Sequence, residues 1–383
     1  METENSIVDI ARLLRDSVLE PMKQAFVGKD EVIELLGVSL VARENLFILG
    51  PPGTAKSAIV QDMAKRIEGK VFDYLLTRFT EPNEIFGPFD IRQLKDGNLV
   101  TNTEGMLPEA TFVFLDELLN ANSAILNSLL MVLNERVFRR GREFRKLPTM
   151  MVVGASNNLP EDEALRALFD RFLLRVHCGN VPDGSLREVL SAGWKLESRE
   201  DQNAAMSVEK VDQLQRAISK VQFGNVTEAF VGLVSKLRQA GIGISDRRAV
   251  KLQRMIAASS IMCGRLNADV TDLWVLRYIW DTVEQQEVIN SIVMRTIEQL
   301  EKDPAIQQHA LARDPAKPDP EKLARDLSAL EQSVGEGVEV AVCLEQLAVL
   351  NQRIEWIENE NQRTALKESL AKIQSRLEQK QPS

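Results

Sequence analysis

The chain has 383 residues, more than one hydrophobic core comfortably supports, so two or three domains are expected. Apolar residues make up 44% of the chain, which is enough to bury a core in each domain. The formal charge of −9 at pH 7 excludes a protein whose whole surface is a footprint for nucleic acid or an anionic membrane, although a local basic patch stays compatible with it.

Cysteine usage and the N-terminal segment indicate the compartment. Cys178, Cys263 and Cys343 are odd in number and far apart, so we expect free thiols in a reducing cytosol and neither a disulfide framework nor a zinc site. The N-terminal segment carries charges throughout, and no later stretch approaches eighteen uncharged apolar residues. We therefore expect a cytoplasmic protein with no transmembrane segment.

The first half of the chain alternates between helix-like and strand-like segments. Residues 7–42 carry apolar side chains at helical spacing, and residues 46–49 form a short apolar run that leads into a helical segment at 56–69. Further strand-like runs begin at Val71, Thr111 and Thr149. Strands alternating with helices predict the α/β fold class, with a parallel sheet covered on both faces, over residues 1–180.

The second half is predicted to be helical. The pattern over residues 181–299 contains helices only, which indicates a separate all-α domain. Residues 300–320 are rich in proline and charge, as a linker would be. Leucine and isoleucine then recur at steps of three and four over residues 321–383, which predicts a helical hairpin or a short coiled coil, with ordinary helix-bundle packing as the alternative.

The stretch "LFILGPPGTAKSAIV" at residues 46–60 has the form of a phosphate-binding loop between a strand and a helix. In such a loop backbone N–H groups and a helix N-terminus converge on an anion. Gly50 and Gly53 supply the turn, Lys56 a charge for the outer phosphates, and Ser57 a ligand for Mg²⁺. The loop therefore predicts ATP and Mg²⁺ as cofactors.

One position departs from the usual pattern G-x-x-x-x-G-K-[ST], because Ala55 replaces the second glycine. We expect Ala55 to lie in the first turn of the following helix, where right-handed backbone angles are normal and a methyl group is tolerated. A glycine that needs a positive φ would not accept this change. On this interpretation the loop keeps its function.

Acidic and polar residues follow two later strand-like runs. Asp116 and Glu117 end the run "FVFLDE", at the edge of the sheet where open α/β folds bind ligands. Together with a phosphate loop they acquire roles, Asp116 in the Mg²⁺ shell and Glu117 in polarising the attacking water. Asn157 ends the run "VVGASNN" and is a candidate to orient that water, or it is an ordinary turn residue. Arg171 in "LFDRF" is either a surface ion-pair residue or a finger into a neighbouring subunit.

The order of these motifs resembles that of MoxR-family AAA+ ATPases, and most closely that of the RavA-type branch. The resemblance covers roughly residues 20–290. The matching stretches are "FVGKDEVIELL", "LGPPGTAKS", "LTRFTEPNEIFGP", "GMLPEATFVFLDE", "ILNSLLMVLNER", "ASNNLPE", "ALFDRF" and "ISDRRAVKLQRMIAASSIMCGR". The alanine of the phosphate loop also recurs in RavA-like relatives.

The resemblance implies an AAA+ P-loop core, an all-helical lid at residues 181–299 and assembly into a ring, usually a hexamer. It also implies a helix-2 insert at about residues 86–109 and a hairpin before sensor 1 at about residues 136–148. The implied catalytic residues are Lys56 of Walker A, Glu117 of Walker B, the sensor 1 residue Asn157, the arginine finger Arg171 acting in trans and the sensor 2 residue Arg247. The implied metal ligands are Ser57 and Asp116. The implied nucleotide contacts are Val27, Gly28, Gly50, Pro51, Pro52, Gly53, Thr54, Ala55, Lys56, Ser57 and Ala58.

The chain departs from the family in two places. Leu119 and Asn120 stand where many MoxR proteins have asparagine and arginine in D-E-I-N-R-A, so an intersubunit role of that arginine is not carried over. The small β-rich region of the RavA C-terminal half does not appear, and a helical extension replaces it. Partners that depend on that region are not inferred.

Three classes of function fit these features. The first is an ATP-driven, chaperone-like remodeller of a protein client, with a von Willebrand factor A (VWA) domain protein as the partner that the resemblance implies. The second is a nucleic-acid motor, favoured by the basic residues of the hairpin and opposed by the acidic total charge. These basic residues are Arg139, Arg140, Arg142, Arg145 and Lys146. The third is a scaffold whose assembly depends on ATP binding and not on hydrolysis.

Overall fold

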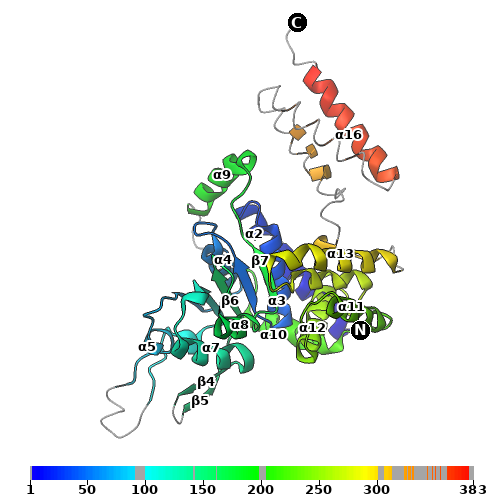
Figure 1. The fold of residues 1–383 in the computed structure, drawn as a ribbon. Helices are drawn as coiled ribbons and strands as arrows, with labels where there is room; N and C mark the ends of the chain where they lie inside the picture. Colours follow the sequence, from blue (N-terminus) through cyan, green and yellow to red (C-terminus); the bar gives the residue numbers. More distant parts are fainter. Residues whose placement is uncertain are drawn as a thin grey trace. The chain divides into compact units, whose positions relative to one another are not determined.

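The computed structural model divides the chain into two compact units, Met1–His309 and Ala310–Ser383 (Figure 1). The structure describes residues 2–90, 100–140, 143–160, 162–197, 204–300 and 306–312, and in the second unit residues 323–325, 327, 328, 330, 331, 343, 347, 350, 354 and 360–378. The centre of the expected helix-2 insert (91–99), the hairpin tip with Gly141 and Arg142, and most of the expected linker therefore lie outside the described residues.

A parallel sheet forms the centre of the first unit (Figure 1). Among the described residues it has five strands in the order β2-β3-β6-β1-β7. The strands are β1 (Leu46–Leu49), β2 (Val71–Leu75), β3 (Phe112–Asp116), β6 (Met151–Ser156) and β7 (Leu174–His177). The inner strands β1, β3 and β6 are buried along almost their whole length, as expected for a parallel sheet covered on both faces. The α/β parallel-sheet fold class is confirmed.

Helices cover the sheet and continue into the helical part of the same unit. The N-terminal segment forms α1 (Glu2–Leu13), the π-helix η1 (Leu14–Leu19), α2 (Glu20–Ala25) and α3 (Asp30–Ala42). Helices that follow or precede strands are α4 (Lys56–Arg66), α5 (Pro82–Phe86), α7 (Ser123–Glu135) and α8 (Glu163–Phe169). Short 3-10 helices are η2 (Leu107–Glu109), η3 (Leu118–Asn120) and η4 (Asp183–Ser185). Helix α3 contacts β1 and β7, so it covers the part of the sheet that these two strands form.

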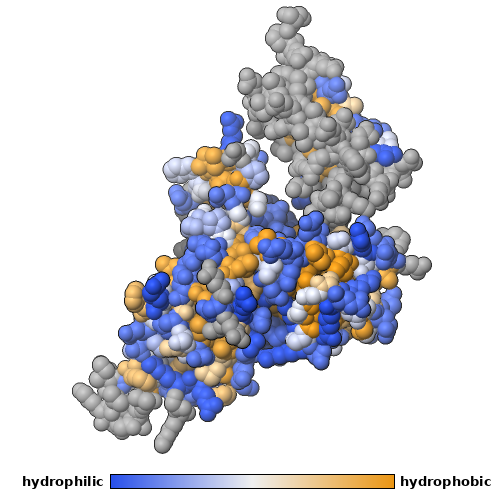
Figure 2. All heavy atoms as spheres, in the orientation of Figure 1, coloured by the Kyte–Doolittle hydropathy of each residue, from blue (hydrophilic) through white to orange (hydrophobic). Residues whose placement is uncertain are grey.

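The segment after the sheet is helical. It contains α9 (Leu186–Glu197), α10 (Val208–Ala217), η5 (Ile218–Lys220), α11 (Val226–Gln239), α12 (Asp246–Met262), η6 (Val270–Tyr278) and α13 (Val283–Gln299). Helix α12 packs on α3, and α10 packs on both α1 and α3, so the lid helices share one compact unit with the sheet. Figure 2 shows apolar side chains gathered on α9, where Leu186, Leu190 and Trp194 are exposed.

Strand β7 carries a buried charge that joins the sheet to the lid. Arg175 is fully buried and pairs with Asp281 at 2.8 Å, while its Nη1 also donates to the carbonyl oxygens of Ile279 and Trp280. Burial and the nearby charge of Arg248 lower the pKa of Arg175 to about 9, although the carboxylates of Asp281 and Asp170 act in the opposite direction. The buried pair thus fixes the turn before α13 against the sheet.

The remaining elements are a hairpin and the second unit. The hairpin pairs β4 (Val137–Arg140) with β5 (Glu143–Lys146) in antiparallel register. In the second unit η7 (Ala310–Ala312) and α16 (Glu360–Glu378) are described. Apolar side chains at the heptad positions form its buried core, namely Leu323, Leu327, Leu330, Cys343, Leu347, Leu350, Ile354, Leu366, Leu370 and Ile373. Within the described residues no helix combines the length and the apolar character needed to cross a membrane.

Candidate functional site

The carboxyl ends of three neighbouring strands bring the predicted site residues to one edge of the sheet. Strands β1 and β6 pair Leu49 with Ser156, so the phosphate loop and Asn157 begin side by side. Strands β3 and β6 pair Leu115 with Gly154, which places Asp116 and Glu117 next to them. This edge is where open α/β sheets bind ligands.

Glycine is required where the phosphate loop begins. The Gly50 N–H donates to the carbonyl oxygen of Ser156 at 3.0 Å, which continues the sheet into the loop. A Cβ atom at Gly50 would lie 2.1 Å from the carbonyl oxygen of Cys178, so no larger residue fits. Residues 51–53 are exposed, and Gly53 adopts φ of +80° with open space around it. Their backbone is accessible to a ligand, as phosphate binding requires.

Ala55 does not lie in the first helical turn. Helix α4 begins at Lys56, and Ala55 is its N-cap, with φ of 65° and ψ of 22° in the left-handed region. The expected right-handed conformation is therefore wrong. The difference arises because α4 begins only at Lys56, so Ala55 belongs to the loop and not to the helix. An alanine in this region costs about 1–2 kcal/mol relative to a relaxed backbone, so the rest of the loop holds a strained conformation that glycine would adopt freely.

Lys56 lies within the loop that it is predicted to serve. Its side chain is buried, and Nζ donates to the carbonyl oxygens of Gly50 at 2.8 Å and Pro51 at 2.9 Å. Thr54 also donates from Oγ1 to the carbonyl oxygen of Pro51, at 2.9 Å. Ser57 and Ala58 follow in the first turn of α4 and are half-buried. The ammonium group is thus held against the carbonyl oxygens of its own loop.

Asp116 and Glu117 are adjacent acidic residues at the end of β3. The Glu117 N–H donates to Oδ1 of Asp116 at 2.9 Å, and Glu117 itself has a left-handed backbone with φ of 49°. Burial and the charge of Asp116 raise the pKa of Glu117, while the charge of Lys56 opposes them. The phosphate-loop lysine is therefore close enough to act on the predicted catalytic carboxylate.

Asn120 is a site residue that the motif comparison treated only as a departure. Its Nδ2 donates to Oε2 of Glu117 at 3.4 Å, from the last residue of η3. The sequence signal for this contact is the spacing of three residues between Glu117 and Asn120 in "DELLN", because it places both residues on one helical turn. Asn120 can hold the Glu117 carboxylate in one orientation.

The remaining residues of this edge lie around the loop. Asn157 is exposed directly after β6. Gly28 has φ of +70°, and a Cβ atom there would lie 2.9 Å from Cγ1 of Val181, so the Val27–Gly28 segment borders the chain that leaves β7. Lys29 donates to the carbonyl oxygen of Gly179 in the same place.

A magnesium ion fits this edge of the sheet. Among the described residues no group of three or more histidine, cysteine and acidic side chains forms a metal site by itself. A Mg²⁺ ion usually keeps water and phosphate oxygens and needs one or two protein ligands. The hydroxyl of Ser57 and the carboxylate of Asp116 are oxygen donors of the kind it prefers, and they fit that requirement.

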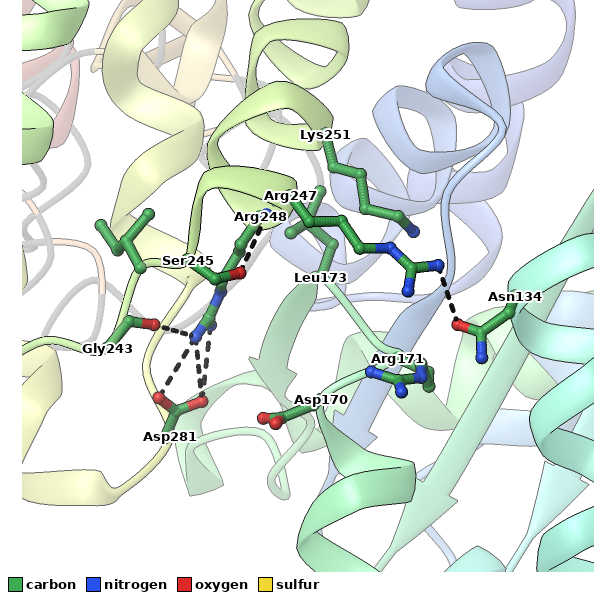
Figure 3. Close-up of a pocket in the computed structure, with 11 residues that line it drawn as sticks. Asn134, Asp170, Arg171, Leu173, Gly243, Ser245, Arg247, Arg248, Lys251 and Asp281 are labelled. Carbon is green, nitrogen blue, oxygen red and sulfur yellow. Dashed lines mark hydrogen bonds and ion pairs between the residues drawn. The ribbon is translucent and has the colours of Figure 1, made fainter.

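The two arginines predicted for the site, Arg171 and Arg247, do not lie beside the phosphate loop. Arg171 and Arg247 line a pocket of about 490 Å³ together with Asn134, Arg248 and Lys251 (Figure 3). None of the phosphate-loop residues lines it. Figure 3 shows Arg247 and Lys251 reaching into the pocket from α12, opposite Arg171 from the turn before β7.

The strand register places this pocket at the amino edge of the sheet. Leu46 of β1 pairs with Leu174 of β7, and Arg171 precedes Leu174. Asn45 lies directly before β1 and donates to the carbonyl oxygen of Arg171 at 2.9 Å. The phosphate loop begins at the other end of β1, about 16 Å away at a rise of about 3.3 Å per residue. Neither arginine therefore reaches Lys56 of its own chain.

Ion pairing divides the cationic side chains of the pocket into two groups. Arg248 donates to both carboxylate oxygens of Asp281, and Lys251 donates to Glu44 at 2.7 Å. Arg247 makes one long hydrogen bond of 3.4 Å to Asn134. The Nε of Arg171 is buried, with no hydrogen-bond partner among the described residues. Arg171 and Arg247 thus form no ion pair among the described residues, in contrast to Arg248 and Lys251.

The basic hairpin uses part of its charge internally. Arg140 donates to the carbonyl oxygen of Gly87 and to Asn83, and its guanidinium lies 3.9 Å from the centre of the Phe89 ring. Arg145 donates to Thr103 at 2.8 Å. These contacts hold the hairpin against the segment that contains the expected insert. They leave fewer free cations for a nucleic-acid backbone than the sequence implies.

Comparisons with known proteins identify the family and the relatives that the chain resembles. The profile of the bpMoxR family, described as the MoxR domain in the MoxR-vWA-beta-propeller ternary systems, matches residues 12–216, and an AAA lid domain profile matches residues 225–293. Two uncharacterised proteins of Methanocaldococcus jannaschii are 35% and 34% identical to the chain, over 73% and 75% of its length and 73% and 83% of theirs. The chaperone MoxR1 of Mycobacterium tuberculosis is 28% identical over 44% of the chain and 45% of its own length.

A solved structure shares the fold. The crystal structure of a "putative ATPase" from Cytophaga hutchinsonii superimposes with a TM-score of 0.64 at 19% sequence identity, and it covers 79% of this chain and 98% of its own. At this identity the likeness concerns the fold alone.

Proposed function

Because the chain belongs to the MoxR family of AAA+ proteins, we propose that it is an ATPase that assembles into a ring and remodels a protein client. One observation carries the proposal. Lys56 and Glu117 lie at the carboxyl edge of the sheet, while Arg171 and Arg247 line a pocket at the amino edge. A complete hydrolytic site then needs two copies of the chain.

Each subunit contributes one half of such a site. The loop amides, Lys56 and Ser57 bind the phosphates and Mg²⁺, with Asp116 in the metal shell. Glu117 takes a proton from the attacking water, and Asn157 orients that water. Arg171 and Arg247 of the neighbouring subunit stabilise the charge of the transferring phosphoryl group. Repeating this head-to-tail contact closes a ring, and a hexamer is the size that the family resemblance supports.

The partner is proposed to be a VWA-domain protein. The description of the matching family names MoxR-vWA-beta-propeller ternary systems. A VWA protein is therefore the first candidate co-chaperone, and a β-propeller protein is a candidate third component. Within the family we place the chain nearest the RavA-type branch, on the stretches "LTRFTEPNEIFGP" and "GPPGTAKS".

A nucleic-acid motor has less support. Arg140 and Arg145 of the basic hairpin are engaged with Asn83, Gly87 and Thr103. The hairpin is therefore better suited to transmitting motion within the chain, or to contacting protein, than to following a phosphate backbone.

The test is the dependence of ATPase activity on assembly. Specific activity should rise with protein concentration, in parallel with the mass measured by light scattering. Arg171→Ala should lower kcat by about 10³-fold, the lower end of arginine-finger effects, and keep ATP binding. Arg216→Ala, on the exposed face of α10, removes an arginine in an exposed ion pair and serves as the matched control. Full activity in a monomer would contradict the proposal.

A further inference from the structure

Asn45 is a buried polar residue at the junction of three segments. It lies directly before β1, and its side chain is almost completely buried. Its Nδ2 donates to the carbonyl oxygens of Arg171 at 2.9 Å and Leu133 at 3.3 Å, and its Oδ1 accepts from Nη2 of Arg136 at 2.5 Å. Both amide hydrogens and the amide oxygen are therefore used.

The three segments meet where the pocket arginines are held. Leu133 and Arg136 belong to the C-terminal end of α7, and Asn134 between them accepts the hydrogen bond of Arg247. Arg171 lies in the turn between α8 and β7. Asn45 therefore fixes the backbone of Arg171 against the same end of α7 that contacts Arg247.

Arg136 makes this junction rigid. It caps α7 in a left-handed conformation, Nη2 donates to Asn45, and Nη1 is buried with no hydrogen-bond partner among the described residues. Its carbonyl oxygen also accepts from the N–H of Leu147, which follows the hairpin. A shift of the Arg171 turn would have to break its hydrogen bond to Asn45, whose amide group is buried and would lose a partner.

We propose that Asn45 is a positioning residue for the arginine finger: it holds the backbone of Arg171 so that the guanidinium group projects toward the nucleotide of the neighbouring subunit. The inference rests on the proposed action of Arg171 in trans. Asn45 precedes the amino end of β1, whereas the phosphate loop follows the carboxyl end, so its proposed effect on hydrolysis is exerted through Arg171. A displacement of about 1 Å at a catalytic group lowers rates by about 10²-fold, which sets the scale of the effect.

Asn45→Asp is the informative substitution. It keeps the shape of the side chain and an oxygen for Arg136, but it removes both N–H donors and sets a carboxylate against two carbonyl oxygens. Gln215→Glu is the matched control, because Gln215 is also buried and donates from Nε2 to one backbone carbonyl, that of Leu40, at 2.8 Å. Both changes replace a buried amide with an acid, and only the first affects Arg171.

Rings mixed from two variants separate the supply of the arginine finger from the binding of ATP. Full-length Arg171→Ala subunits keep an intact phosphate loop and lack the finger, and full-length Lys56→Ala subunits keep the finger and lack the loop lysine. An equal mixture should regain ATPase activity. The second substitution is then placed in the Lys56→Ala subunit alone, so the sites that turn over carry no change near their own nucleotide. Mass by light scattering and thermal unfolding of each donor are measured alongside.

The donor is the Lys56→Ala subunit, which supplies Arg171 to its neighbour. When the donor also carries Asn45→Asp, the inference predicts a tenfold to hundredfold loss of kcat and an unchanged KM for ATP. When the donor carries Gln215→Glu instead, full activity is expected. Full activity with the Asn45→Asp donor would overturn the inference while leaving the action in trans intact. Equal loss with both donors would also overturn it, since the effect would then be a general loss of stability. No activity in the starting mixture would overturn the proposed function, and the inference with it. If Asn45→Asp does not fold, Asn45→Ser, which keeps one donor, should give an intermediate kcat, and an unchanged kcat would refute the role.

Discussion

The carbonyl oxygen of Gly50 accepts a hydrogen bond of 2.8 Å from Nζ of Lys56, so the loop satisfies its own lysine. A phosphate group must replace this contact, and its charge makes it the stronger acceptor. We expect Lys56→Ala to weaken ATP binding at least 100-fold. The free energy of unfolding should fall by about 1–3 kcal/mol, because the buried ammonium group donates to the carbonyl oxygens of Gly50 and Pro51 and these lose their donor.

Titration with a fluorescent ATP analogue measures this loss. Arg171→Ala is the companion variant, because it removes a cation from the other edge of the sheet and should bind the analogue normally. Tight binding by Lys56→Ala would show that the loop is not the nucleotide site.

Ala55→Gly tests the left-handed conformation of the loop by the sign of its effect. Ala55 has φ of 65°, which glycine adopts without strain. Relief of about 1–2 kcal/mol of strain exceeds the roughly 0.5–1 kcal/mol by which glycine favours the unfolded chain. We expect the free energy of unfolding to rise by up to about 1 kcal/mol in urea denaturation, with ATP binding kept. A loss of about 1 kcal/mol, the cost of glycine in a right-handed helix, would contradict this placement.

Asn120→Ala tests the contact between Asn120 and Glu117, the proposed catalytic base, through the pH dependence of kcat. Burial and Asp116 raise the pKa of Glu117, and a hydrogen bond donated by Asn120 favours its charged form. Removing that donor should raise the pKa further. If Glu117 is the proposed base, it acts in its ionised form and kcat falls as pH falls, so this acidic limb should move to higher pH in Asn120→Ala.

The profile of kcat is measured from pH 5 to 8 at saturating ATP. Leu119→Ala changes the neighbouring residue without a hydrogen bond to Glu117 and should leave the limb in place. A limb that stays in place or moves to lower pH in Asn120→Ala would contradict the role of the contact.

The local sequence pattern is sufficient to predict the strands that consist of uninterrupted apolar residues. The runs at 46–49 and 112–116 are buried on both faces, so composition alone marks them. Strand β7 was missed because Arg175 interrupts its apolar run, and that arginine is buried only because the lid supplies Asp281. A charged residue in a sequence is normally assigned to the surface, and only the structure reveals a buried partner that is distant in sequence.

The site was predictable in part for the same reason. Residues at the carboxyl ends of strands were grouped correctly at one edge, because parallel strands share their direction. The separation of Arg171 and Arg247 from Lys56 was not visible, since it depends on how α12 packs beside the start of β1. Ala55 was placed wrongly because the sequence does not show at which residue the helix begins.

Glu34→Gln tests an ion pair that sequence spacing did not indicate. Nε2 of His309 lies 3.1 Å from Oε2 of Glu34, Lys23 donates to Oε1, and the His309 ring stacks on Trp274 with ring centres 4.4 Å apart. Burial alone would raise the pKa of Glu34, but His309 and Lys23 outweigh it and lower the pKa to about 2. The cluster ties α3 to the end of the first unit.

The direction of the pH effect follows from these values. The pKa of Glu34 is lower in the folded chain than its ordinary value of 4.5, so its contribution is complete above about pH 4.5 and is lost as pH falls toward 2. We expect Glu34→Gln to lower the free energy of unfolding by roughly 2–3 kcal/mol at pH 7. Urea denaturation should show the two proteins converging as pH falls from 5 to 3. The control is Asp212→Asn, which breaks the exposed pair with Arg216 and should lower the free energy of unfolding by about 0.3–0.5 kcal/mol. If the difference between Glu34→Gln and the unsubstituted protein stayed constant with pH, the ion pair of Glu34 would be refuted.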